Sequence, residues 1–171
     1  NATADAPKAG TTVHLAWDAE ALYIGLDCDE PLMADVLESV SERDGPAWTD
    51  NAVEIFVDGA SSGKDFHQLI LTSAGALLDG RMVDGAFSSS WDMSDEELQY
   101  AVSRHDVGWR VELRLTWAGL AMSQPDAGST LRFNITRDRN VVVADESEAT
   151  ALSPTFGGFH APARFATLTL R

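Results

Sequence analysis

The chain has 171 residues, a length typical of one domain with its own hydrophobic core. Apolar residues make up 44%, which argues against disorder, and no run of 18 apolar residues is present, which argues against insertion into a membrane. The net charge of −15 disfavours nucleic acids, anionic membranes and anionic polysaccharides as partners, because like charges repel. Neutral glycans and calcium ions remain compatible with this charge.

The chain contains one cysteine, Cys28, which excludes an internal disulfide and a cysteine-based zinc site. Cys28 continues the alternation of Leu22, Ile24 and Leu26, so we expect a buried, small apolar side chain. The sequence begins at Asn1 without a recognisable signal peptide. We therefore expect residues 1–171 to be a single domain excised from a longer, multidomain protein.

Apolar and polar residues alternate with period two along most of the chain, which predicts β-strands. Short helical turns are expected within 33–41 and 117–120, and residues 84–97 form a polar loop. Many short strands with little helix predict an all-β protein, a β-sandwich of jelly-roll type. The predicted strands are 12–17, 21–28, 52–58, 64–73, 76–83, 98–105, 109–117, 130–137 and 164–170.

Strand 109–115 has apolar residues at its odd positions, which should face the core. Its even positions carry alternating charges, which would either pair across strands or bind a ligand. Three tryptophans fall in strand or turn positions and are predicted to be core residues: Trp17, Trp109 and Trp117.

The most informative segment is WTDNAVEIFVD, residues 48–58. Val53, Ile55 and Val57 would face one side of its strand, and Glu54 would face the other. An unpaired carboxylate in the middle of a strand is costly unless that face is wet or binds something. Trp48 lies in the Gly-Pro-containing approach, where a large ring can stay accessible. A flat apolar ring beside hydrogen-bonding groups is a common way to hold a sugar.

This segment resembles the family 9 carbohydrate-binding modules and the wider DOMON-like group of β-sandwiches. Three further segments resemble the same family in the same order: VHLAWDAEALYIG at 13–25, GWRVELRLTWAGL at 108–120 and FHAPARF at 159–165. The resemblance implies a β-sandwich that binds carbohydrate without catalysis, spread over most of the chain.

The resemblance also implies roles for individual residues. Trp48 matches one wall of the family's aromatic clamp, and Phe159 matches the second wall, which is usually tryptophan. Glu54 matches the carboxylate that accepts sugar hydroxyls, and Gln68 matches an amide on the neighbouring strand. The family's basic residue two positions further is replaced by Ile70, which weakens the expectation of the usual preference for reducing ends of glucose and xylose chains.

Two other aromatic residues are candidate stacking surfaces. Phe156 lies in the same glycine-rich loop as Phe159, and Trp91 lies in a serine-rich loop. Packing in the protein interior is the competing interpretation for each of these rings.

A structural calcium ion is expected near Asp29 and Asp50, where the resembled family holds one. Oxygen-rich turns suit Ca²⁺, but the chain has no complete D-x-D-x-D-G loop. Solvated turn carboxylates are the competing interpretation.

Three alternatives to glycan binding remain. A glycosidase would need Glu54 and Glu112 within roughly 5–10 Å of each other. A haem domain would recruit ligands from the set Met82, Met93, Met122, His67 and Lys64, but no C-x-x-C-H motif is present. A structural or protein-binding sandwich would have no glycan site.

The sequence therefore predicts a non-catalytic module, secreted or located at a bacterial cell surface or in the periplasm. It would hold a short neutral glycan, such as a plant-type β-glucan or xylan, between Trp48 and a loop aromatic. Its partners would be an oligo- or polysaccharide and an attached catalytic domain, which it would keep near the substrate.

Overall fold

The computed structural model describes residues 5–143 and 145–171. Among these residues, no helix is both long and apolar enough to cross a membrane. Over residues 5–143 and 145–171, eleven strands and three short 3₁₀ turns make up the regular structure. The predicted all-β class is therefore confirmed. The helical turn expected within 33–41 is the 3₁₀ turn η1 (Met33–Asp35), whereas residues 117–120 form a turn that is not a 3₁₀ helix.

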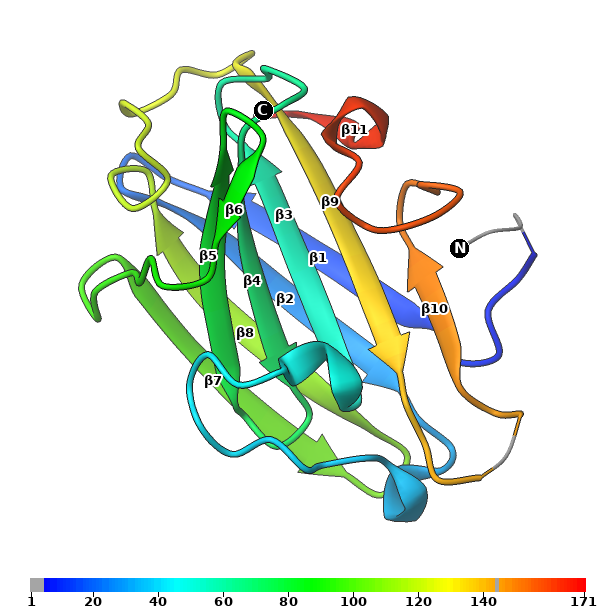
Figure 1. Ribbon diagram of the computed structural model, residues 1–171. Coiled ribbons are helices and arrows are strands. Elements are labelled where there is room, and N and C mark those ends of the chain that lie inside the picture. The colour runs from blue at the N-terminus through cyan, green and yellow to red at the C-terminus, as the bar shows by residue number, and fades with distance from the viewer. Residues whose placement is uncertain (1–4, 144) are drawn as a thin grey trace.

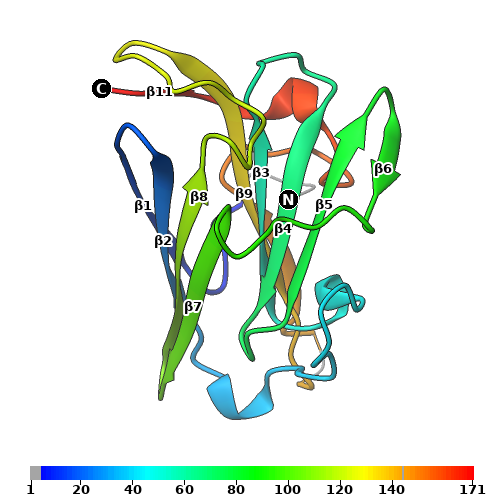
Figure 2. The same cartoon turned by 90° about the vertical axis from the view of Figure 1, so that its left-hand side faces the viewer.

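Two antiparallel sheets face each other (Figures 1 and 2). The smaller sheet has the strand order β1-β2-β8-β7 and the larger one β10-β9-β3-β4-β5-β6, with β11 also pairing with β9. The smaller sheet comprises β1 (Thr11–Trp17), β2 (Ala21–Asp29), β8 (Gly108–Thr116) and β7 (Leu98–His105). The larger sheet comprises β10 (Glu148–Ala151), β9 (Thr130–Arg139), β3 (Ala52–Asp58), β4 (Phe66–Thr72), β5 (Leu77–Val83), β6 (Ala86–Ser88) and β11 (Ala166–Thr169).

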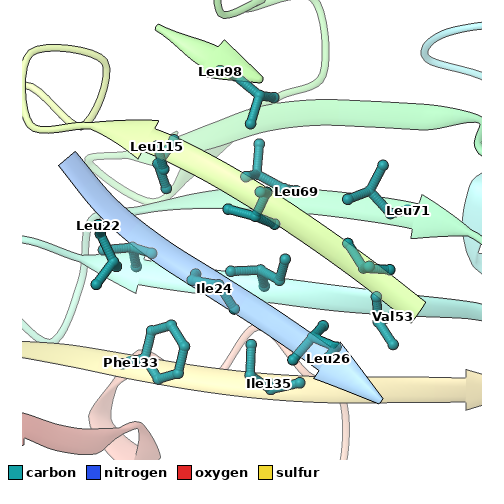
Figure 3. Packing of buried hydrophobic residues seen from close by; sticks show 14 of the residues in the cluster. Leu22, Ile24, Leu26, Val53, Leu69, Leu71, Leu98, Leu115, Phe133 and Ile135 are labelled. Atoms are coloured by element: carbon teal, nitrogen blue, oxygen red, sulfur yellow. The ribbon is translucent and has the colours of Figure 1, made fainter. Parts of the chain in front are cut away.

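The core lies between the two sheets and is built from alternate residues of their central strands. Figure 3 shows Ile24 and Leu26 of β2 meeting Val53 of β3 and Ile135 of β9. The predicted alternation in β8 is confirmed, because its odd positions are buried. Trp109, Trp117 and Cys28 are buried as predicted, whereas Trp17 is only partly buried and packs at the edge of the core.

Two short strands were missed by the sequence patterns. Residues 86–88 fall within the predicted polar loop but pair with β5 as β6. Residues 148–151 pair with β9 as β10. Both are edge strands of three or four residues, too short for a period-two pattern to stand out from a loop.

An ion network joins the two sheets at one end of the sandwich. Glu30 follows β2 and is fully buried, and both of its oxygens accept hydrogen bonds from Arg139 at 2.7 and 2.9 Å. Arg137 and Asn51 each donate to Glu30 Oε2, at 3.1 and 3.0 Å. Because both arginines lie on β9, this network ties the end of the smaller sheet to the larger one.

The outer face of the larger sheet is covered rather than open to water. The 3₁₀ turn η2 (Ala47–Thr49) contacts β3 and β4, and the chain before β11 carries a second such turn, η3 (Pro162–Arg164). Figure 2 shows both on the side of the larger sheet away from the smaller one. As a result every residue of β3 is buried, including those that point away from the core.

Candidate functional site

A cleft of about 690 Å³ lies on this covered outer face. Its volume falls within the range usual for small-molecule sites, roughly 300–1,000 Å³. Its floor comes from the central strands of the sheet, and its walls come from three loops. The lining residues are Asp44, Trp48, Glu54, Gln68, Ile70, Leu78, Phe87, Ser89, Asp138, Gly158, Phe159 and His160.

Trp48 presents its ring at the rim of the cleft. The side chain is 50% exposed, whereas its neighbour Ala47 is buried in a small apolar cluster with Ala52, Ile70 and Leu78. The backbone of η2 is therefore anchored to the sheet while the indole remains outside. A large exposed ring above an apolar floor is a surface on which a flat ligand face can stack.

The turn that carries Trp48 is held in place by two polar contacts. Asn140 Nδ2 donates to the carbonyl oxygens of Trp48 and Asp50, at 3.1 and 3.0 Å. The buried carboxylate of Asp50 accepts from the hydroxyl and amide of Ser39 and from the amide of Val40, at 2.7 to 2.8 Å. Asp50 thus fixes the two segments that lead into β3. Calcium binding at Asp29 and Asp50 stays a prediction.

A chain of polar side chains crosses the floor of the cleft. Gln68 Nε2 on β4 donates to Glu54 Oε2 on β3 at 2.6 Å, and Gln68 Oε1 lies 2.8 Å from His160 Nε2. The expected proximity of Glu54 and Gln68 is therefore confirmed. Because Gln68 uses its amide nitrogen toward Glu54, its oxygen accepts from His160, so His160 carries the hydrogen on Nε2.

Asp138 on β9 lies against Glu54 from the other side. The two carboxyl groups are in hydrogen-bonding contact. Burial, together with this hydrogen bond and the negative charge of Asp138, raises the pKa of Glu54 to about 9. Burial also raises the pKa of Asp138 and lowers the pKa of His160. The carboxyl groups of Glu54 and Asp138 in the floor are therefore not both ionised at neutral pH.

The loop before η3 supplies the far wall of the cleft. Phe159 is partly buried and packs against a cluster formed by Phe56, Phe66 and Phe165. The His160 ring contacts the ring of Phe87 of β6 in a tilted arrangement, with 4.9 Å between the ring centroids. These ring contacts hold the loop against the outer face of the sheet, opposite the turn that carries Trp48.

One known protein family matches the whole chain. The model of the carbohydrate family 9 binding domain-like family matches residues 1–171. The chain belongs to this family. A search of curated proteins gives no match.

Solved structures share the fold of this family 9 chain. A family 9 carbohydrate-binding module from Caldicellulosiruptor kristjanssonii, solved with cellotriose, is 17% identical and superposes with a TM-score of 0.73, covering 98% of this chain and 78% of that chain. The same description applies to a structure with glucose, at 16% identity, a TM-score of 0.73, and 98% and 80% coverage. A protein from Bacteroides uniformis is 19% identical with a TM-score of 0.78, covering 96% of this chain and 79% of that one.

Within this family 9 domain, four of the six predicted sugar-contacting residues line one cleft: Trp48, Glu54, Gln68 and Phe159. The other two lie outside it. The Trp91 ring contacts the His67 ring in a tilted arrangement at 4.9 Å, lies beneath the Arg81 guanidinium, and packs against the main core. Phe156 is exposed, with Arg164 over its ring at 5.0 Å. Loop composition alone could not distinguish these surroundings.

Five polar or aromatic residues of the cleft were not predicted: Asp44, Phe87, Ser89, Asp138 and His160. Asp138 had a detectable signal, because the β9 alternation places it on the same face as Asn134 and Thr136, away from the core. Phe87 and His160 had none, since they reach the cleft from a short edge strand and from a loop. Ile70, which replaces the family's basic residue, belongs to the apolar floor.

Proposed function

We propose that this domain is a non-catalytic glycan-binding module whose ligand occupies the cleft on the outer face of the larger sheet. A short neutral glycan, such as a β-glucan or xylan segment, would stack between Trp48 and Phe159. Glu54 and Gln68 would fix its orientation through hydrogen bonds to hydroxyl groups. A small aromatic site with few hydrogen bonds gives micromolar to millimolar affinity, roughly 4–8 kcal/mol.

The observation that carries this proposal is the combination of groups in the cleft. An indole that is 50% exposed stands beside the apolar side chains of Ile70 and Leu78 and the buried Glu54–Gln68 pair. Sugars present an apolar C–H face and hydroxyl edges, so they match both kinds of surface. Membership of a carbohydrate-binding family, and the cellotriose and glucose named for the similar structures, support the same ligand class.

The absence of catalysis is part of the proposal. Glu54 lies on the outer face of the larger sheet, whereas Glu112 is exposed on the outer face of the smaller sheet, at the other side of the sandwich. The carboxyl partner that Glu54 does have, Asp138, touches it, whereas glycosidase carboxyls stand roughly 5–10 Å apart. The domain would instead keep an attached enzyme or a cell surface near polysaccharide, outside the cytoplasm.

A calorimetric screen against soluble neutral oligosaccharides at pH 6 tests the proposal. The panel contains cello-, xylo-, manno- and laminari-oligosaccharides, each with the wild type and with Trp48→Ala. Binding of one class by the wild type, lost or strongly weakened in Trp48→Ala, is the expected result. Phe156→Ala is the matched control, because Phe156 is equally exposed but lies outside the cleft. No binding across the panel would reject the proposal.

A further inference from the structure

Asp138 adds a second carboxyl group to the floor of the cleft. It lies on β9, next to β3, and Ala52 and Glu54 of β3 pair with Asp138 and Thr136 respectively. Because pairing partners share a face and side chains alternate, Asp138 and Glu54 point to the same outer side, two residues apart along the sheet. Their carboxyl groups meet there in hydrogen-bonding contact.

The described residues that line the cleft include no lysine or arginine to neutralise this pair. The other charged or titratable groups that face it are Asp44, from the loop before η2, and His160, from the loop before η3. Asp44 adds negative charge, and burial keeps His160 neutral by lowering its pKa. Two carboxylates in contact without a cation repel each other strongly, so one proton between them is required.

The hydrogen bonds across the floor of the cleft are directed toward the carboxyl pair. His160 donates to Gln68, and Gln68 donates to Glu54 Oε2, so every donor in the chain is directed toward the carboxyl pair. Asp138 Oδ2, at the end of the chain, is buried and receives no hydrogen bond from the described part of the protein. Because Glu54 and Asp138 both line the cleft, the network ends in carboxyl groups that a ligand with hydrogen-bond donors can contact.

Resting on the proposed glycan site, we infer that Glu54 and Asp138 share one proton and act together as the charge-selective floor of the cleft. Asp138 is then a specificity-determining residue. Hydroxyl groups of a neutral sugar donate to the free oxygens of the pair. A sugar carboxylate in the same place offers no donor and adds a negative charge next to a pair that already carries one. Loss of the shared proton at alkaline pH also weakens the binding of the neutral sugar.

A pH titration of two properties tests this inference in the wild type, in Asp138→Asn and in Asp106→Asn. Asp106 is an exposed residue of the β7–β8 turn, and its substitution controls for the loss of one acidic group. The first property is the titration midpoint of the Glu54 side-chain carboxyl, followed by ¹³C NMR without ligand. The second is calorimetric affinity for cellotriose, and for its C6-carboxylated uronic acid form, between pH 6 and pH 10.

We expect the Glu54 midpoint to lie above pH 7 in the wild type and in Asp106→Asn, and to fall in Asp138→Asn. Cellotriose affinity should drop about tenfold from pH 6 to pH 10 in the wild type, because one unit above a pKa of about 9 leaves about a tenth of the pair protonated. This drop should disappear in Asp138→Asn, whose amide hydrogen-bonds to Glu54 without a shared proton. The uronic acid form should bind at least tenfold more weakly than cellotriose to the wild type.

A Glu54 midpoint near 4.5 in the wild type, or an unchanged midpoint in Asp138→Asn, would overturn the shared proton. Equal affinity for the neutral and carboxylated probes would overturn the selective role of Asp138. A raised midpoint that falls in Asp138→Asn, with no binding of either probe or of the screened oligosaccharides, would uphold the shared proton and reject the glycan site. Circular dichroism at pH 10 separates loss of affinity from unfolding.

Discussion

Two buried glutamates of this domain have different partners and opposite pKa shifts. Glu30 is fully buried at the end of β2, between the guanidinium groups of Arg137 and Arg139. Glu54 is 4% exposed in the middle of β3, and its partners are the neutral Gln68 and a second carboxyl group, Asp138. Although burial acts against the charged form of both, the pKa of Glu30 is lowered by Arg139 and Asn51, whereas that of Glu54 is raised.

The difference separates a structural carboxylate from one available to a ligand. The oxygens of Glu30 accept from Arg139, Arg137, Asn51 and the amide of Leu32, so little remains for another partner. Glu54 accepts one hydrogen bond from Gln68, and its other side-chain partner is a second acid, Asp138. A buried carboxyl group without a cation is costly for folding, and such costs are typical of functional sites.

Substitution of Glu30 should have the largest effect on stability. Glu30→Gln removes the negative charge that pairs with buried Arg137 and leaves buried Arg139 with only the partly exposed Glu146, at 3.9 Å, and breaking a buried pair in this way typically costs about 3–5 kcal/mol. The free energy of unfolding, measured by urea denaturation at pH 7, should fall by about that amount. Glu54→Gln is the matched control, because it replaces a buried carboxyl group at a site with no cation, and we expect it to leave stability unchanged or raised. Equal losses in the two variants would contradict the comparison.

Truncation of Trp48 should affect binding and leave the fold intact. Trp48→Ala removes an exposed ring from the rim of the cleft, and a central stacking aromatic typically contributes about 1.5–3 kcal/mol to binding. Calorimetry with the glycan identified in the screen should show this loss. The melting temperature should stay close to the wild-type value, because half of the ring is already in water. If the variant unfolds instead, Trp48 is a core residue and does not form a wall of the cleft.

The pH dependence of stability should distinguish the two glutamates. The pKa of Glu54 is raised in the folded state, so its contribution is present below its ordinary pKa of 4.5 and is lost as pH rises toward about 9. The pKa of Glu30 is lowered, so its contribution is present above its ordinary pKa and is lost only as pH falls below it. Between pH 7 and 9, the histidines with lowered pKa are already neutral in both folded and unfolded chains.

We therefore expect the wild-type melting temperature to decrease by a few °C from pH 7 to pH 9, since about 1 kcal/mol corresponds to roughly 2–4 °C at this size. In Glu54→Gln the decrease should be smaller, and Glu30→Gln should keep the wild-type slope at a lower melting temperature. A flat wild-type profile over this range would show that Glu54 is ionised in the folded protein at pH 7.

Much of the fold was predictable because its signals are local. Period-two alternation located the long strands, and it placed Val53 and Glu54 on opposite faces, as observed. The alternation did not show that the outer face of β3 is also buried, because the segments that cover it come from residues 40–50 and 152–165. Short edge strands such as β6 carry too few residues for any periodic signal.

The candidate site was predictable only where its residues lie on strands or in a recognised motif. The family resemblance placed Gln68 on the strand next to Glu54, and their hydrogen bond is observed. Asp138 is brought to Glu54 by the pairing of β9 with β3, strands that are separated by about half of the chain. The arginine partners of Glu30 are even more distant from it in sequence, so the ionised state of Glu30 also depends on contacts with β9 that only the folded chain makes.

Asp50 is a third buried carboxylate, with a different set of partners. Removal of divalent cations should have the smallest effect on the melting temperature. Its Oδ1 accepts from the Ser39 hydroxyl, and its Oδ2 accepts from the amides of Ser39 and Val40. Protein donors thus already satisfy a group that calcium would need as a ligand, and a metal that binds only weakly adds little to the stability of the folded state. The melting temperature should therefore change by less than about 1 °C on addition of EDTA, measured by calorimetry against a magnesium- and calcium-supplemented control. A larger decrease, reversed by calcium and abolished in Asp29→Asn, would establish the predicted structural calcium site and show that Asp50 is held by a cation, as Glu30 is, and not by backbone amides alone.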